Sequence, residues 1–416
     1  MKARLLIIWF LLLAAGCALP VGRKRGPIPR ELLNARYVDE SLETHCNPVD
    51  PFVIAAMKRT MQKKREELPA DRPSERPMHI LAISSGGMYG AFDVGVLNGW
   101  SNSGTRPQFD LVTGVSTGAL IATFAFLGPE HDEFLRNSYI CATSDDIYQR
   151  RSVFAMITSD SIARSRPLKE KIDAAITPEI LQEVALAHAK GRRLYVGTTN
   201  LDTRRQTIWD MGAIASVGTD ESLELYRKII LASSSVPGFM PPVMIDVEVD
   251  GQRIEEMHVD GATTASVFLP TAMMKCDPQN LRLRPGSNVY VICSGKLYAD
   301  TDTVKRHFMS ITIDAITSMM YSGCRNDIFR IFTTTLLCGM DFHLIALPKD
   351  FPPKPKNSGL ALPPEQVRSL YEIGWKMGMS KDSWRQTPPG SEADEQTVPR
   401  TGTRYKTVGE RLTVPQ

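Results

Sequence analysis

A Gly-x-Ser-x-Gly pentapeptide at residues 114–118 is the part of this 416-residue sequence best suited to chemistry. The apolar run 109–113 leads into it, and a strongly apolar segment of helical composition follows it. A serine at a sharp strand-to-helix turn is pushed out of the backbone, where its hydroxyl can attack a carbonyl carbon. Gly114 and Gly118 are the glycines of such a turn. We therefore predict that Ser116 is the nucleophile of an acyl-transfer reaction.

A second glycine turn lies one strand and one helix upstream of Ser116. Gly86, Gly87 and Met88 follow the apolar run 79–83, which is expected to be a buried strand. Backbone N–H groups in a glycine turn can bind the oxyanion that forms when a serine attacks a carbonyl group. We therefore predict that the N–H groups of these three residues form the oxyanion hole.

A serine nucleophile needs a base, and histidine is the usual one. Among the histidines downstream of Ser116, four are candidates for the base, and none of them follows a strand in a convincing loop: His188, His258, His307 and His343. A structural or surface role is therefore expected for each. A Ser-His-Asp esterase nevertheless remains an alternative.

Asp260 is a better partner for Ser116 than any of these histidines. It lies with Gly261 at the end of the predicted strand 256–261, at the carboxyl end, where both glycine turns also lie. A carboxylate with an ordinary pKa of about 3.9 is a poor base, but burial raises the pKa and proximity supplies much of the rest. The residues alone leave two roles open for Asp260: the base of a Ser–Asp dyad, or the cap of an Asx turn, which Asp-Gly favours.

The elements around these residues alternate between strands and helices, which predicts an α/β sheet with crossover helices. In such sheets ligands bind at the carboxyl ends of the strands. Strands are expected at 79–83, 109–113, 192–200, 207–210, 256–261, 288–293 and 343–347. Helices are expected at 91–100, 118–127, 223–232, 304–339 and 364–379.

The amino terminus has the pattern of an export signal. Lys2 and Arg4 precede the apolar run 5–15, which is too short to span a bilayer, since a spanning helix needs about 20 residues. Residues 14–17 resemble a bacterial lipobox, in which the cysteine is lipidated. The sequence thus predicts an exported bacterial lipoprotein anchored by lipid on Cys17, at the outer membrane or the periplasmic face. An ordinary secretory signal is the alternative.

The whole chain is expected to consist of five parts. They are a lipoprotein signal peptide at 1–16, a tether with a peripheral helix at 17–77, a catalytic domain at 78–347, a C-terminal extension with a helix packing on that domain at 348–382, and a disordered tail at 383–416.

Charge and cysteine content limit the possible partners. Lysine and arginine total 49 against 46 aspartates and glutamates, so the net charge of +3 does not predict a nucleic-acid partner. The cysteines after Cys17 show no zinc-binding spacing, so no metal site is predicted. We expect mainly buried thiols, with room for one disulfide.

The three motifs together, in this order, resemble those of the patatin-like phospholipase family. The matching pieces are 85–90 for the oxyanion loop, 114–118 for the nucleophile turn and 260–262 for the dyad aspartate, with further blocks at 196–200 and 232–242. The resemblance covers roughly 78–347. It implies a three-layer α/β/α fold with a mainly parallel central sheet, and a Ser–Asp dyad that hydrolyses membrane-lipid acyl esters without calcium or a cofactor.

The first glycine turn departs from the family pattern at Ser84, Ser85 and Tyr89. The family usually has aspartate and glycine at the first two places and arginine or lysine at the third. Because Ser85 keeps its N–H, we expect the number of oxyanion donors to be maintained. The missing basic residue leaves neutral lipids or lysolipids open as substrates. The altered turn also permits a different function, a membrane lipoprotein that binds lipid with little or no turnover.

Overall fold

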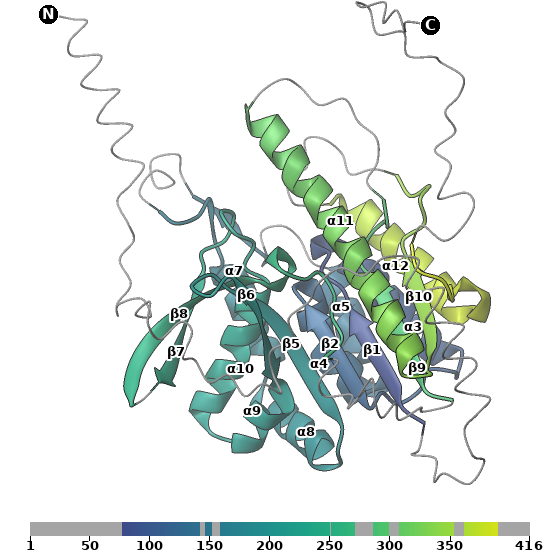
Figure 1. Cartoon of the computed structure of the whole chain (residues 1–416), viewed down its shortest axis with the longest axis horizontal. Helices are drawn as coiled ribbons and strands as arrows, with labels where there is room; N and C mark the ends of the chain where they lie inside the picture. The colour runs from purple at the N-terminus through teal and green to yellow at the C-terminus, as the bar shows by residue number, and fades with distance from the viewer. Residues whose placement is uncertain are drawn as a thin grey trace, which may run out of the picture.

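A computed structural model gives the fold of the chain (Figure 1). The residues that it describes are 77–141, 146–151, 159–249, 251–270, 286–298, 308–352 and 362–389. Several predictions lie outside these residues: the signal peptide, the lipidated Cys17, the tether with its helix, and the tail beyond residue 389. His307 lies outside them as well.

A mainly parallel sheet organises the described part of the chain (Figure 1). Its hydrogen-bonded order is β10-β9-β1-β2-β5-β8-β7, and β6 also pairs with β5. The strands from β10 to β5 run parallel, β6 and β8 run antiparallel to β5, and β7 forms a hairpin with β8. Their bounds are β1 His79–Ile83, β2 Leu111–Val115, β5 Arg193–Asn200, β6 Arg205–Asp210, β7 Val243–Val249, β8 Gln252–Asp260, β9 Asn288–Cys293 and β10 Asp341–Ala346. A separate pair joins β3 (Gln149–Arg150) to β4 (Ala163–Arg164).

Helices cover both faces of the sheet, because the central strands are apolar on both sides. In β1, Leu81 and Ile83 point into the core under α3, α4 and α10, while Ile80 and Ala82 point into the core under α11. These layers confirm the predicted α/β/α fold. The helices are α3 Gly90–Asn102, α4 Thr117–Leu127, α5 Asp132–Ile140, α7 Arg166–Ala175, α8 Pro178–Ala189, α9 Met211–Val217, α10 Asp220–Ser233, α11 Phe308–Leu337 and α12 Pro364–Met379. Short 3-10 turns are η1 Gly87–Tyr89, η2 Pro129–His131, η4 Gly261–Thr263 and η6 Lys381–Ser383.

Glycines on both helices bring α12 into close contact with α3. A Cβ atom at Gly95 would lie 2.2 Å from the carbonyl oxygen of Tyr371, and one at Gly374 would lie 2.2 Å from that of Phe92. The two backbones therefore touch at positions where only glycine fits. The C-terminal extension is thus part of the same fold as the sheet.

Residues 383–389, which the sequence assigned to a disordered tail, pack on the rest of the fold. Leu344 of β10 and Arg385 exchange two backbone hydrogen bonds of 2.7 and 2.8 Å, and the ring centroids of Trp384 and Trp100 are 4.7 Å apart. The polar, proline-bearing composition of this stretch does not reveal that Arg385 pairs with the edge strand β10 or that Trp384 packs against Trp100.

Several strands differ from the predicted ranges or were not predicted. β2 begins at Leu111 and not at 109, because Asp110 turns the chain against His79: its N–H donates to the His79 carbonyl at 2.8 Å, and its carboxylate accepts from the His79 N–H at 2.9 Å. β7 was not predicted, although its acidic residues alternate with apolar ones, which is the pattern of a half-buried strand. Within the described residues, no helix is long and apolar enough to cross a membrane.

Candidate active site

Ser116 occupies the sharp turn between β2 and α4. Its φ of 56° and ψ of −122° place a non-glycine residue in a region that side chains rarely adopt, and such strain recurs at functional sites. Gly114 and Gly118 let the turn pack closely. A Cβ atom at Gly114 would lie 2.3 Å from the Gly118 carbonyl oxygen, and one at Gly118 would lie 2.6 Å from the Ile83 carbonyl oxygen. The geometry is that of a nucleophile turn.

β2 and β8 meet end to end along one side of β5. Val115, the last residue of β2, pairs with Gly197, and the next residue of β5, Thr198, pairs with Asp260 at the end of β8. β6 occupies the other side of β5 over the same residues, so β2 and β8 must share a side. Asp260 therefore reaches Ser116 from the opposite direction. The carboxyl ends of parallel strands share one edge of a sheet, but this rule does not predict the position of Asp260, because β8 is antiparallel to β5.

The side chains of Ser116 and Asp260 are in direct contact. The Ser116 hydroxyl donates to Oδ2 of Asp260 at 2.7 Å, and Oδ1 accepts from the Ala262 N–H at 2.8 Å. The Asx-turn contact and the contact with the serine thus coexist, because one oxygen caps η4 and the other faces Ser116. Burial raises the pKa of Asp260 to about 6, against the lowering effect of these two hydrogen bonds. The carboxylate is therefore a stronger base than an exposed aspartate, yet still ionised at neutral pH.

Three consecutive serines after α10 hold the backbone of both residues. The Ser233 hydroxyl accepts from the Ser116 N–H at 2.9 Å and donates to the Gly197 carbonyl at 2.7 Å. The Ser234 hydroxyl donates to the Ser116 carbonyl at 3.3 Å, and the Ser235 carbonyl accepts from the Asp260 N–H at 2.8 Å. Sequence reasoning assigned no role to these serines. The run of three at a helix end was the available signal.

Gly86, Gly87 and Met88 lie in the wall of the cavity that contains Ser116. No group among the described residues accepts a hydrogen bond from their three N–H groups. Gly87 has a φ of 56°, and a Cβ atom at Gly86 would lie 2.2 Å from the Cβ of Ser294. The conformation therefore requires glycine at both positions, and it leaves three donors available at the cavity.

Ser85 does not offer its N–H to the cavity. Its N–H donates to the Ser266 carbonyl at 2.8 Å and is therefore occupied. The buried Ser84 hydroxyl donates to the Ser85 carbonyl at 2.8 Å and accepts from the Ser294 N–H at 2.9 Å. The two serines thus fasten the glycine turn to the segments that follow β8 and β9.

Asp93 in the first turn of α3 belongs to the same support. It is fully buried, it accepts a hydrogen bond from the Ser294 hydroxyl, and burial raises its pKa well above the usual range. Ser294 also donates to the Ser84 carbonyl at 3.0 Å. Sequence reasoning missed Asp93, although an acidic residue within the apolar helix 91–100 was a signal.

The described histidines lie away from the cavity, and none of them lines it. His258 is buried between Thr198 Oγ1 at 2.9 Å and Glu256 Oε2 at 3.1 Å. His343 stacks on Tyr290 and contacts Asn288 Oδ1 at 2.8 Å, and His188 lies 3.6 Å from Asp210. These contacts fit the structural or surface roles that the sequence indicated.

The cavity has a volume of about 660 Å³ and a mostly apolar wall. Ser116 and Asp260 supply polar groups beside the glycine turn. The apolar lining comes from several helices and includes Leu120, Phe124, Leu135, Ile172, Ile230 and Met240. Such a cavity suits a ligand with long hydrocarbon chains.

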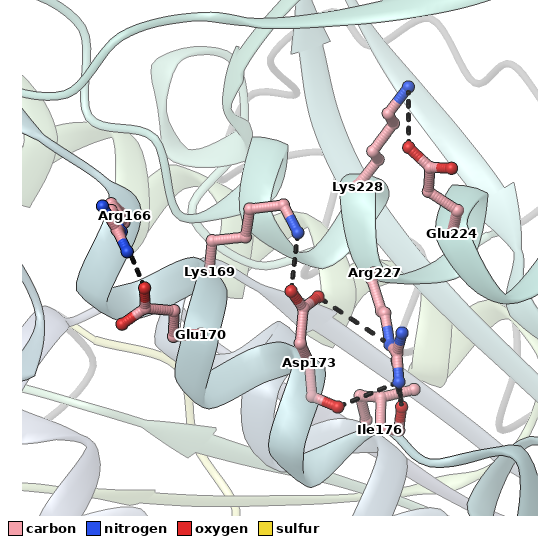
Figure 2. Close-up of polar contacts among 8 residues, drawn as sticks. All are labelled: Arg166, Lys169, Glu170, Asp173, Ile176, Glu224, Arg227 and Lys228. Atoms are coloured by element: carbon pink, nitrogen blue, oxygen red, sulfur yellow. Dashed lines mark hydrogen bonds and ion pairs between the residues drawn. The ribbon is translucent and has the colours of Figure 1, made fainter.

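Helix α7 forms one wall of the cavity, and α10 holds it in place. Figure 2 shows Arg227 of α10 reaching the C-terminal end of α7. Its guanidinium donates to the carbonyl of Asp173 at 2.9 Å and twice to that of Ile176, at 2.6 and 2.9 Å. The surrounding pairs Arg166–Glu170 and Lys169–Asp173 lie along α7 itself (Figure 2). Arg227 thus satisfies carbonyls that a helix end leaves without partners.

Two of the cysteines also line the cavity. The sulfur atoms of Cys293 and Cys324 are 3.8 Å apart and carry free thiols, whereas Cys338 is disulfide-bonded. Cys141 is free and exposed, so burial is not general among the thiols. Within the described ranges, no group of three or more His, Cys, Asp or Glu residues is placed to hold a metal ion.

Comparisons with known proteins found a matching family and a similar solved structure. Residues 81–273 match the model of the family described as patatin-like phospholipase. Among solved structures, the chain is similar to VipD from Legionella pneumophila, with 10% identity, a TM-score of 0.38, and coverage of 78% of this chain and 74% of that one. No curated protein sequence matches the chain. Through residues 81–273, the chain carries a domain of the patatin-like phospholipase family.

Proposed function

We propose that the chain is a serine hydrolase that cleaves fatty-acyl ester bonds of phospholipids or related lipids through Ser116 and Asp260. The observation that carries the proposal is the 2.7 Å hydrogen bond from the Ser116 hydroxyl to the buried Asp260 carboxylate, in the wall of an apolar cavity. The family match supports lipid acyl hydrolysis in general.

The reaction begins when Asp260 takes the hydroxyl proton and Ser116 Oγ attacks the ester carbonyl carbon. The N–H groups of Gly86, Gly87 and Met88 stabilise the resulting oxyanion, and one such donor contributes about 2.7–4 kcal/mol of transition-state stabilisation. The alcohol, a lysolipid, leaves with the proton from Asp260, and the acyl group stays on Ser116. Water then gives a proton to Asp260 and attacks the acyl carbonyl carbon. The bond to Ser116 breaks, Asp260 returns the proton to Ser116 Oγ, and the fatty acid is released.

The position of the base favours a dyad over a Ser-His-Asp triad. Asp260 contacts the nucleophile directly, while His258 is held by Thr198 and Glu256. The burial that raises the pKa of Asp260 to about 6 supplies the basicity that an exposed carboxylate lacks.

The wall of the cavity favours a lipid acyl chain as the group that Ser116 receives. Tyr89 lines it in place of the basic residue usual in the family loop, so a cationic contact to an anionic head group would have to come from elsewhere. Lys171 and Lys296 are lysines of the lining. A neutral lipid or a lysolipid also fits this environment.

We further propose that the chain is exported and anchored by lipid on Cys17, which would bring the cavity to its substrate. The support is the signal-like pattern of residues 2–17 alone. Metabolic labelling with radioactive palmitate tests this proposal: the wild type should incorporate the label, and Cys17→Ser should not.

Release of fatty acid from phosphatidylcholine in mixed micelles tests the hydrolase proposal. General-base catalysis is typically worth about 10²–10⁴ in rate, so Asp260→Asn should lose at least that much, and Ser116→Ala should be inactive. Ser216→Ala, a serine of α9 outside the cavity, serves as the control and should match the wild type. Circular dichroism would verify that each variant is folded.

Two other results would each point to a rival. If Asp260→Asn kept full activity while His258→Ala or His343→Ala lost it, a histidine triad would replace the dyad. If the wild type bound the micelles and released no fatty acid, the chain would be a lipid-binding lipoprotein on this scaffold.

A further inference from the structure

Residues 314–320, in the first half of α11, form a projecting segment with little cover. Residues 314–320 are all exposed, and because an α-helix has 3.6 residues per turn, seven consecutive exposed residues include every face of the helix. Figure 1 shows the first turns of α11 extending beyond the neighbouring strands and helices. The side chains of Ile316 and Met319 are 51% and 72% exposed. Such high exposure is unusual for apolar side chains.

The projecting segment and the residues that flank it have few charges. Residues 308–322 contain one charged residue, Asp314. Monomeric proteins rarely expose contiguous apolar patches, and those that exist mark interaction sites with proteins or membranes. Isolated exposed side chains need no such explanation, but four apolar ones lie within ten residues of one helix: Ile311, Ile316, Met319 and Met320.

The same segment borders the cavity that holds Ser116. Thr317, Met320, Tyr321 and Cys324 line it, and their spacing of three, four and seven residues puts them on one face of α11. Ile316 and Met319 do not line the cavity. Met320 both lines the cavity and is exposed, so the apolar wall of the cavity continues into the exposed apolar surface of the helix.

Other exposed apolar side chains lie at the rim of the cavity. Phe134 of α5 is 42% exposed and Val236 of the loop after α10 is 38% exposed, and both line it. Three separate elements thus present apolar groups around one cavity, and one of them projects outward.

We propose that the projecting segment of α11 inserts into the surface of a phospholipid bilayer and sets the mouth of the cavity against the lipid. The proposal rests on the function proposed above, since it supplies the route by which an acyl chain enters. A chain passing from bilayer to Ser116 then stays in contact with apolar side chains and avoids water. The continuity between the helix and the lipid-type cavity favours a bilayer over a protein partner or a second copy of the chain.

Fluorescence quenching by brominated lipid tests the insertion directly. The full chain carrying Cys17→Ser, which cannot be lipidated, is mixed with phosphatidylcholine vesicles containing brominated acyl chains. Met319→Trp should add a strongly quenched component to the fluorescence of the parent. Leu186→Trp, at a 56% exposed leucine of α8 outside the cavity, is the matched control and should add an unquenched one. Equal quenching at both positions, or none at Met319→Trp, would overturn the proposal.

Hydrolysis separates this proposal from the proposed function. Ile316→Glu combined with Met319→Glu should lower fatty acid release from vesicles at least 10-fold and leave cleavage of a water-soluble short-chain ester unchanged, while Leu186→Glu should change neither. If both activities fell together, or if the double variant only converted a dimer into a monomer, membrane insertion by α11 would be rejected. If the wild type cleaved neither substrate, the hydrolase proposal would fail, and quenching at Met319→Trp would still decide the insertion.

Discussion

At the scale of single residues, burial makes the carboxylate of Asp260 more basic than that of an exposed aspartate. Its two oxygens are divided between the Ser116 hydroxyl and the Ala262 N–H, and little water reaches either of them. Loss of solvation raises its pKa to about 6, which is close enough to neutral pH for efficient proton transfer. The dyad thus needs no third group to be chemically competent.

The rate of ester cleavage should therefore rise with pH across an acid limb centred near 6. Asp260 accepts the serine proton only when it is ionised, and its pKa of about 6 places half-ionisation there. The measurement is kcat/KM for a soluble ester from about pH 4.5 to 8. Asp327 of α11 is also buried with a pKa of about 6 and does not line the cavity, so Asp327→Asn should keep the limb. Loss of the limb in Asp327→Asn would assign it to that residue.

A sequence predicts the residues of the motifs better than it predicts the residues that hold those motifs in position. Ser116 and Asp260 stand in short motifs whose chemistry limits the residue types. Ser233 and Ser294 act through a hydroxyl that contacts a backbone group far away in the chain. Since a serine can make such contacts almost anywhere, its type alone does not indicate the partner.

Among the elements, α3 connects the site to the C-terminal extension. It begins directly after the glycine turn, and α12 packs on it through glycines that admit no side chain. The position of the three N–H donors therefore depends on a helix that lies far downstream in the sequence. The helical spacing of apolar residues predicts that α12 is a helix, but it does not predict which surface of the fold α12 covers.

Gly374→Ala should destabilise the protein by about 1–3 kcal/mol, the usual cost of an overpacked interface. The added methyl group would lie 2.2 Å from the Phe92 carbonyl oxygen, and backbone atoms on both helices would have to move. Urea unfolding measures the change. Gly323→Ala in α11, where no atom lies within 4 Å of the new methyl group, should be neutral or stabilising by up to about 1 kcal/mol. Equal stability of the two variants would contradict the close packing of α3 and α12.

On the scale of the molecule, the family match stops before the fold does. Residues 81–273 include Ser116, Asp260 and the glycine turn, while β9, β10, α11 and α12 complete the sheet and its layers. The three-layer, mainly parallel arrangement was implied by the family resemblance, and the order of strands and helices alone was sufficient to predict an α/β sheet with crossover helices. It did not predict that β8 returns antiparallel to meet β2 end to end, because that arrangement depends on β5 being longer than β2 and offering the same side to both.

Trapping of the acyl-enzyme tests the central claim most directly. The wild type is mixed with a long-chain phosphatidylcholine, quenched in acid within the first turnovers, digested and analysed by mass spectrometry. We predict a fatty-acyl group on the peptide containing Ser116, and none in Ser116→Ala. Fatty acid release by Ser116→Ala at the wild-type rate, or an acyl group on any other residue of the wild type, would contradict the account.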